Sequence, residues 1–129
     1  MQPVYLSNYT LATCLGLGRD ANWHAVAQQR TGLKPCVFES VKLPTFIGEV
    51  RGVDAVRMPA RLAHYHCRNN QLAQLALEQD AFTEAVKAAI ATFGKHRVGV
   101  FLGTSTSGIL STELAYRKRD AATGELPGD

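Results

Sequence analysis

The apolar residues of the chain predict one fully buried strand, at residues 98–102. This run reads Val-Gly-Val-Phe-Leu, carries no charge, and is long enough for a strand that is covered on both faces. Gly103 and Gly108 then enclose four hydroxyl residues, and a helical pattern begins after Gly108. Open α/β sheets place binding sites in such turns, at the carboxyl end of a strand. The candidate binding residues are therefore Thr104, Ser105, Thr106 and Ser107.

Two longer helices are predicted upstream of this strand. One spans about 60–79, with Pro59 in its first turn. Its Cys-Arg-Asn-Asn sequence at 67–70 predicts hydrogen bonds to a neighbouring loop or a break, because asparagine is a poor residue for a helix interior. The other spans 80–93 and ends at Gly94. Its apolar residues recur at helical spacing and are expected in the core; they are Phe82, Val86, Ala89 and Phe93.

The rest of the chain predicts shorter elements. Asp20 is expected to cap a helix that Gly32 ends. Trp23, Val26 and Ala27 have helical spacing and are expected on its core face. The other predicted elements are a strand at 4–8, a second apolar stretch at 46–50, a helix at 107–119, a loop at 10–18, a loop with a little strand at 34–43, and an exposed turn at 120–129.

Composition narrows the class of protein. With 129 residues, of which 46% are hydrophobic and 19% charged, the chain is long enough for one globular domain. Its net charge of +3 is scattered apart from a basic triplet at 117–119, which argues against a nucleic-acid-binding face. No run is apolar and long enough for a membrane span, and the amino terminus lacks the pattern of a signal peptide. Three separated cysteines without a Cys-x-x-Cys pair indicate a reducing compartment, so a cytoplasmic protein is expected.

Motif spacing excludes several chemistries for the hydroxyl turn and identifies no catalytic residue. Gly103 and Gly108 have the spacing of a phosphate-binding loop, but that loop needs Lys and then Ser or Thr where this chain has Ile109 and Leu110. No serine stands in a Gly-x-Ser-x-Gly elbow, and no cysteine stands in a sharp strand-to-helix turn. A purely structural role stays open, in which the small residues let a helix pack closely on the sheet.

The nearest approach to a metal-binding cluster is formed by His64, His66 and Cys67. On a helix, positions 64 and 67 share a face, but position 66 points elsewhere. A zinc site would also need a second cluster of ligands, which the sequence lacks. We therefore expect no metal site and no cofactor, with Cys67 packing between helices and both histidines acting as ordinary polar residues.

Four stretches resemble the amino-terminal part of the β-ketoacyl-(acyl carrier protein) synthases, members of the thiolase-fold superfamily of condensing enzymes. Gln-Arg-Thr-Gly-Leu at 29–33 is similar to the turn after the family's first helix, and Leu-Pro-Thr-Phe-Ile-Gly-Glu-Val at 43–50 resembles its Gly-Glu-Val segment. Cys-Arg-Asn-Asn at 67–70 resembles the next helix, and Gly-Thr-Ser-Thr-Ser-Gly-Ile at 103–109 resembles the strand and turn that follow. The order and spacing match along nearly all 129 residues.

This resemblance implies an α/β fold, the N-terminal part of a thiolase-like layered α-β-α architecture. Residues 1–129 would form a single, incomplete domain, truncated before the nucleophile elbow. The implied enzyme is an acyltransferase of fatty acid or polyketide-type synthesis, which joins an acyl thioester to malonyl-(acyl carrier protein) by decarboxylative Claisen condensation. The family's catalytic cysteine and two histidines lie beyond the equivalent of Asp129, so the isolated chain is expected to be inactive. Thr104 to Ser107 would border the acyl channel, with Thr106 facing the acyl chain.

The resemblance also implies partners. Acyl carrier protein is expected to bind through the full-length enzyme, and further copies are expected in a homo-oligomer; neither nucleic acid nor a membrane is expected. Two other functions stay open: a condensing-enzyme partner subunit without a nucleophile, similar to a chain-length factor, and a small acyl-thioester or nucleotide-binding module. Because half of a family sheet would leave an apolar face and a strand edge uncovered, we expect the chain to self-associate.

Overall fold

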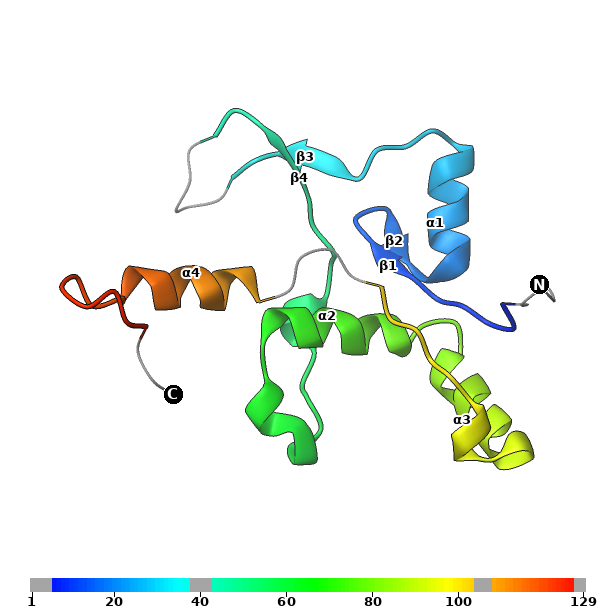
Figure 1. Ribbon diagram of the computed structural model, residues 1–129. Helices are drawn as coiled ribbons and strands as arrows, with labels where there is room; N and C mark the ends of the chain where they lie inside the picture. The colour runs from blue at the N-terminus through cyan, green and yellow to red at the C-terminus, as the bar shows by residue number, and fades with distance from the viewer. Residues whose placement is uncertain (1–5, 38–42, 104–107, 127–129) are drawn as a thin grey trace, which may run out of the picture.

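The computed structural model describes residues 6–37, 43–103 and 108–126, and combines helices with two short antiparallel pairs of strands (Figure 1). Helix α2 lies near the centre of the molecule, and α4 extends away from the other elements. In chain order the elements are β1 (Ala12–Thr13), β2 (Gly16–Leu17), α1 (Gly18–Ala27), β3 (Leu33–Pro35), β4 (Phe46–Gly48), the 3₁₀ helices η1 (Val53–Ala55) and η2 (Ala60–Tyr65), α2 (Arg68–Leu77), α3 (Phe82–Phe93), the 3₁₀ helix η3 (Lys95–Arg97) and α4 (Ile109–Arg117).

Strands β1 and β2 form a tight hairpin that leads directly into α1. Ala12 pairs with Leu17, and Thr13 pairs with Gly16. The Thr13 hydroxyl oxygen accepts the Leu15 amide at 3.0 Å, which closes the turn between the strands. The loop predicted over 10–18 is therefore wrong for these residues, because local hydrogen bonds order a segment that has no apolar pattern.

Helix α1 buries a different face from the predicted one. Trp23 is 69% exposed and Val26 is 59% exposed, so the expected core face lies in solvent. The buried residues are Gly18, Asn22 and Ala25. The helix also begins at Gly18 rather than after Asp20, which makes no capping hydrogen bond with its side chain.

Hydrogen bonds of Asn22 explain this choice of face. Its side-chain amide donates to the carbonyl oxygens of Gly16 at 2.9 Å and Gly18 at 2.7 Å. Its side-chain oxygen accepts the hydroxyl of Thr13. A buried polar group must be satisfied in this way, and here the satisfied partners all lie in the β1–β2 hairpin or in the first turn of α1. The helix is thus oriented by polar contacts that an apolar period does not reveal.

Helix α1 ends at Ala27, before the predicted stop at Gly32. Gln29 adopts a left-handed conformation with φ of 53°, which ends the helical path. Gly32 serves a different purpose, because a Cβ there would lie 2.7 Å from the sulfur of Cys14. A Cβ at Gly48 would lie 2.8 Å from the same sulfur. These two glycines therefore let the antiparallel β3–β4 pair approach the turn of the first hairpin closely.

The helix predicted over 60–79 is broken, as the asparagine pair suggested. The 3₁₀ helix η2 ends at Tyr65, and α2 begins at Arg68. The side chain of Asn70 donates to the Tyr65 carbonyl oxygen at 2.7 Å, so the break has its own hydrogen bond. Buried Gln71 donates to the carbonyl oxygen of Val56 at 2.9 Å and ties α2 to the segment after η1.

Asp80 connects the corner between α2 and α3 to the start of α1. Positive φ angles at Asp80 (55°) and Ala81 (53°) turn the chain between the two helices. The Asp80 carboxylate accepts the Arg19 amide at 3.0 and 3.1 Å and the Thr10 hydroxyl at 2.8 Å. A carboxylate here satisfies an amide of the first turn and complements the helix dipole. Gly18 makes room for it, since a Cβ at that position would lie 2.9 Å from the Asp80 carboxylate.

Helix α3 has the predicted position but not the predicted burial. It spans Phe82–Phe93, and Gly94, with φ of 82°, ends it. None of its residues is buried, and Phe93 is exposed. The expectation that its apolar face packs in the core is wrong for this structure, because the element that it chiefly contacts is the short η3 turn that follows it. The helical spacing of the apolar residues correctly predicted a helix, but it did not predict which element the helix packs against.

Residues 98–102 form no strand, which overturns the prediction of a buried one. The segment is exposed apart from partly buried Val98, and Phe101 is 97% exposed. No described residue makes a backbone hydrogen bond to residues 98–103. The physical reason is that an apolar run supplies side chains for burial, but a strand also needs a neighbouring strand for its amides and carbonyls.

The chain as a whole exposes far more surface than a compact domain of its size. Its accessible area is 10916 Å², about 1.6 times the value of roughly 6,700 Å² expected for a compact 14.0 kDa monomer. Helix α4 begins at Ile109 rather than at 107, and residues 120–126 are exposed as predicted. Helices and strands together agree with the α/β class at a coarse level. Among the described residues, no helix has the length and apolarity that crossing a membrane requires.

Candidate functional site

The predicted site in the hydroxyl turn lies outside the described residues. These positions are Thr104, Ser105, Thr106 and Ser107. On one side, the exposed segment 98–103 approaches the turn. On the other side, Gly108 adopts a left-handed conformation with φ of 71° and directly precedes α4. The helix predicted to follow these positions is thus present, while the predicted strand before them is an unpaired segment.

An apolar groove of about 850 Å³ lies beside the approach to this turn. It is formed by residues 6–13, by one side of α2 together with Phe82, and by residues 99–103. Polar groups enter it from Thr10, Asn69 and Asn70. The larger apolar residues along its walls are Leu6, Leu11, Leu72, Leu77, Phe82, Val100, Phe101 and Leu102. Such a lining suits a hydrocarbon chain or an apolar peptide better than a charged ligand.

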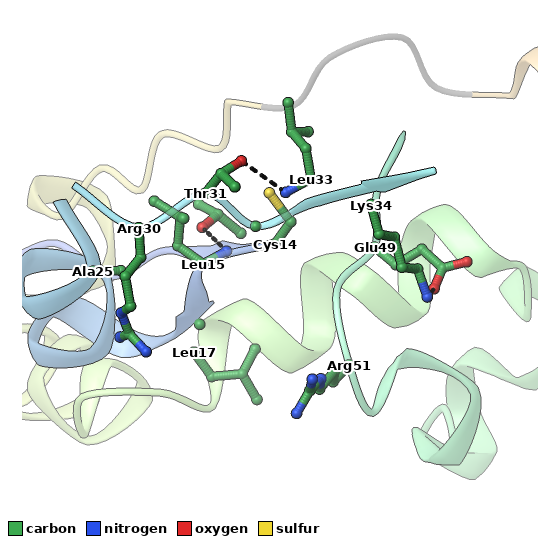
Figure 2. A pocket seen from close by; sticks show the side chains of 13 residues that line it. Cys14, Leu15, Leu17, Ala25, Arg30, Thr31, Leu33, Lys34, Glu49 and Arg51 are labelled. Atoms are coloured by element: carbon green, nitrogen blue, oxygen red, sulfur yellow. Dashed lines mark hydrogen bonds and ion pairs between the residues drawn. The ribbon is translucent and has the colours of Figure 1, made fainter. Parts of the chain in front are cut away.

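A second hollow, the basic cleft, lies where the two strand pairs meet (Figure 2). Its volume is about 520 Å³. Lys34 and Glu49 form an ion pair at one side of it. The other charged residues are Arg30 and Arg51, whose guanidinium groups point to the same side of Cys14 in Figure 2 and form no ion pair with a described residue. Guanidinium groups bind phosphate and carboxylate well, so the basic cleft suits an anion.

Cys14 lies in the same cleft, but its surroundings do not activate it. Its partly buried thiol lies close to Gly32 and Gly48. A nucleophilic thiol needs a neighbouring base, and no histidine lines this cleft. Cys36 is also partly buried, and Cys67 is exposed. Among the described residues, the cleft therefore brings together no cysteine and histidine that could act as a catalytic pair.

The residues considered for a metal site lie on the surface. His64 and His66 are exposed, and the imidazole of His64 contacts the ring of Tyr65, with ring centroids 3.9 Å apart. Exposed Cys67 precedes α2 and does not pack between helices, so that expectation is wrong. The part of the chain that the structure describes contains no group of three side chains able to hold a metal ion.

Two structurally central residues escaped sequence analysis. Asn22 follows no motif that predicts its burial. Asp80 stands at the start of the predicted helix 80–93, yet α3 begins only after Ala81, and the Asp80 carboxylate accepts the Arg19 amide in the first turn of α1 instead. Arg30 and Arg51 were also missed, because only the contact between the two strand pairs brings them to one cleft.

The comparisons with known proteins assign no family to the chain. No protein-family model, no curated protein and no solved structure matches the chain. The sequence motifs and the geometry of the two hollows therefore carry the functional inference.

Proposed function

We propose that the chain is the amino-terminal segment of a β-ketoacyl-(acyl carrier protein) synthase and that its apolar groove contributes to the wall of an acyl channel. The observation that carries this proposal is the position of the groove, whose lining reaches Gly103. The hydroxyl residues that the family resemblance assigns to the acyl channel follow directly in the sequence. An apolar wall favours a hydrocarbon ligand, because burying each methylene group contributes about 0.8 kcal/mol.

The described residues form two short antiparallel strand pairs and not a layered thiolase-like sheet, and the segment 98–102 is unpaired. In the full-length enzyme, further strands would supply the backbone partners that this segment lacks here. Exposure of Val100, Phe101 and Leu102 supports such a role, since three large apolar neighbours in solvent are costly. The large accessible area of the whole chain supports it as well.

In the proposed reaction the acyl carbonyl carbon, held as a thioester on a cysteine of the full-length enzyme, forms a bond with the central malonyl carbon. The bond from that carbon to the malonyl carboxylate breaks, carbon dioxide leaves, and the cysteine departs as a thiolate. Residues of this chain take no part in bond making. Their role is to accommodate the acyl chain and to limit its length.

Extending the polypeptide tests this assignment. The coding sequence after codon 129 should encode a Thr-Ala-Cys-like elbow and two later histidines, and the extended enzyme should release carbon dioxide from malonyl-(acyl carrier protein). The purified 129-residue chain should release none. Robust turnover by that chain would contradict the proposal. An elbow with its cysteine replaced would instead support the non-catalytic partner subunit.

Product length gives a sharper test of the channel wall. In the extended enzyme, Thr106→Phe should shorten the longest product by several carbons, because the ring would occupy space expected for the acyl chain. Thr92→Phe is the matched control, since Thr92 is exposed on α3 and away from the groove lining. Mass spectrometry of the products measures both. Equal product lengths in the two variants would show that Thr106 does not line the acyl channel.

The basic cleft favours a second candidate, an acyl-thioester or nucleotide-binding module. Arg30 and Arg51 line one hollow of about 520 Å³ and match the charge of a phosphorylated ligand. Coenzyme A at one hundred times its dissociation constant should then stabilise the chain by about 2.7 kcal/mol, which raises Tm by several degrees. The double variant Arg30→Gln with Arg51→Gln should lose this rise. An unchanged Tm with coenzyme A and with ATP would reject this function.

A further inference from the structure

Helix α3 has an apolar face that meets solvent at its carboxyl-terminal end. Phe82, Val86 and Ile90 recur every four residues and Phe93 follows three positions later, so these side chains share one face of the helix. None of them is buried. Ile90 is 39% exposed and Phe93 is 59% exposed. The last turn of α3 therefore presents an aliphatic and an aromatic side chain to the solvent.

The position of α3 leaves this end of the helix open. Figure 1 shows α3 at one extremity of the molecule, away from the two strand pairs. The element that it chiefly contacts is η3, which consists of Lys95, His96 and Arg97. A polar three-residue turn offers little apolar surface to cover a helix. Exposed apolar residues that are bordered by polar ones mark surfaces for association with another molecule or with a membrane.

The charges around this end of α3 are all positive. Residues 85–112 contain no aspartate or glutamate, and their three basic residues of fixed charge are Lys87, Lys95 and Arg97. All three are exposed, and none forms an ion pair with a described residue. Lys87 neighbours Ile90 on the helix surface, because residues three apart on a helix are adjacent. The exposed apolar end of α3 is therefore bordered by cations that are not neutralised within the described chain.

We propose that residues 82–97 bind the surface of an anionic lipid bilayer, with α3 lying along the interface. Ile90 and Phe93 enter the boundary between headgroups and acyl chains, and the three basic side chains contact the anionic headgroups. Helices that lie in the interface combine Phe or Leu on one side with Lys or Arg beside it. The 12 residues of α3 extend about 18 Å, so the helix lies on the bilayer and does not cross a hydrocarbon core of about 30 Å.

This inference does not rest on the proposed condensing enzyme, and it differs from the sequence-based expectation of no membrane partner. The sequence placed the apolar face of α3 in the core, whereas the structure exposes part of that face. An acidic protein would also match the positive charge. A bilayer matches more of the surface, because it accepts apolar and cationic side chains together without requiring a complementary shape.

Vesicle flotation tests the charge requirement, since bound protein floats with the vesicles whereas aggregated protein sinks. Vesicles with about 30% phosphatidylglycerol should bind the chain at least tenfold more tightly than vesicles of phosphatidylcholine alone, because each basic residue near an anionic surface contributes roughly fivefold. Lys87→Glu combined with Lys95→Glu should weaken binding at least tenfold. The matched control is Lys118→Glu combined with Arg119→Glu, which makes the same change of charge after α4 and should weaken binding less than about threefold.

A phenylalanine pair tests the apolar contact. Phe93→Ser should weaken flotation at least threefold, whereas Phe46→Ser, at a position of similar exposure (66%), should not change it. Circular dichroism should show the same helix content in both variants. Absence of flotation, equal binding to both kinds of vesicle, or equal losses in the variants and their controls would each overturn the proposal. Binding to soluble polyglutamate without flotation would overturn it as well and assign the surface to an acidic protein.

Discussion

Residues 10–80 and residues 82–126 differ in what holds them together. The residues that are buried in the described part of the chain all belong to the first region: Gly18, Asn22, Ala25, Val53, Gln71 and Leu75. The second region contains two helices of predicted position but has no buried residue among those described. An apolar sequence pattern alone therefore does not decide which region forms a core.

Hydrogen bonds show the same difference. In the first region, side chains join distant segments, as in the bonds from Thr10 to Asp80 and from Gln71 to Val56. Among the described residues of the second region, side-chain bonds stay local, as between Arg117 and Glu113 on α4. That exposed i,i+4 pair stabilises a helix by only about 0.3–0.5 kcal/mol. We expect the first region to unfold cooperatively and the second to behave as local helices.

The largest effect is expected from Asn22→Asp, which should destabilise the first region. A carboxylate cannot donate to the carbonyl oxygens of Gly16 and Gly18, and it would face both of them in a buried site. The free energy of unfolding should fall by about 3 kcal/mol or more. Urea denaturation followed by circular dichroism measures it. The control Asn8→Asp keeps its acceptor role toward the Tyr9 amide and should change stability by less than about 0.5 kcal/mol; similar losses in both would contradict the role of Asn22.

A pair of leucine truncations compares the two regions directly. Leu75 is 9% exposed in the first region, and Leu114 is 45% exposed in the second. Leu75→Ala should lower the free energy of unfolding by about 2 kcal/mol, which is the lower end of the range for truncating a buried leucine. Leu114→Ala should cost less than about 0.5 kcal/mol in the same denaturation measurement. Equal costs would show that the second region has a core of its own.

Asp80→Ala is expected to lower the free energy of unfolding by an intermediate amount. It removes the acceptor for the Arg19 amide and the Thr10 hydroxyl, and should cost about 1–2 kcal/mol. Hydrogen exchange of the Arg19 amide should accelerate, while exchange along α4 stays unchanged. Glu84→Ala is a matched control, since Glu84 is an exposed acidic residue in the first turn of α3. Faster exchange throughout both regions would mean that they are one cooperative unit.

The smallest effect is a pH response confined to the second region. The backbone amides of Thr123 and Ala122 donate to the Asp120 carboxylate at 2.6 and 2.8 Å and hold its pKa below its ordinary value of 3.8. Because the folded pKa is the lower one, the stabilisation is present above pH 3.8 and is lost as the pH falls through the folded pKa. NMR shifts of these two amides should change in that range. In Asp120→Asn, which still accepts but does not titrate, they should not.

The sequence predicted local structure well where local rules decide it. The end of α3 at Gly94 follows from the left-handed conformation that glycine tolerates. The break before α2 follows from the asparagine pair, and Asn70 makes the hydrogen bond that stabilises it. In both cases, the deciding contacts lie within a few residues along the chain. Strand β4 lies within the apolar 46–50 stretch, but it pairs with β3, 11 to 15 positions earlier in the chain.

Distant contacts explain what the sequence did not predict. Burial of Asn22 depends on Thr13 in the preceding hairpin, and the start of α1 depends on Asp80. The 98–102 run has the composition of a buried strand, but pairing needs a neighbour that no single segment specifies. For the candidate site, the sequence indicated the turn at 104–107, which lies outside the described residues, and gave no sign of the basic cleft.

The bond between Arg19 and Asp80 also has a consequence for biosynthesis. The two residues are 61 positions apart, and a ribosome adding about 5–20 residues each second needs roughly 3–12 seconds to make that distance. Throughout this interval the Arg19 amide lacks the Asp80 carboxylate that accepts it in the folded chain. Nascent chains halted before codon 80 should therefore leave α1 accessible to proteases and chaperones, and release of a slightly longer chain should close that window.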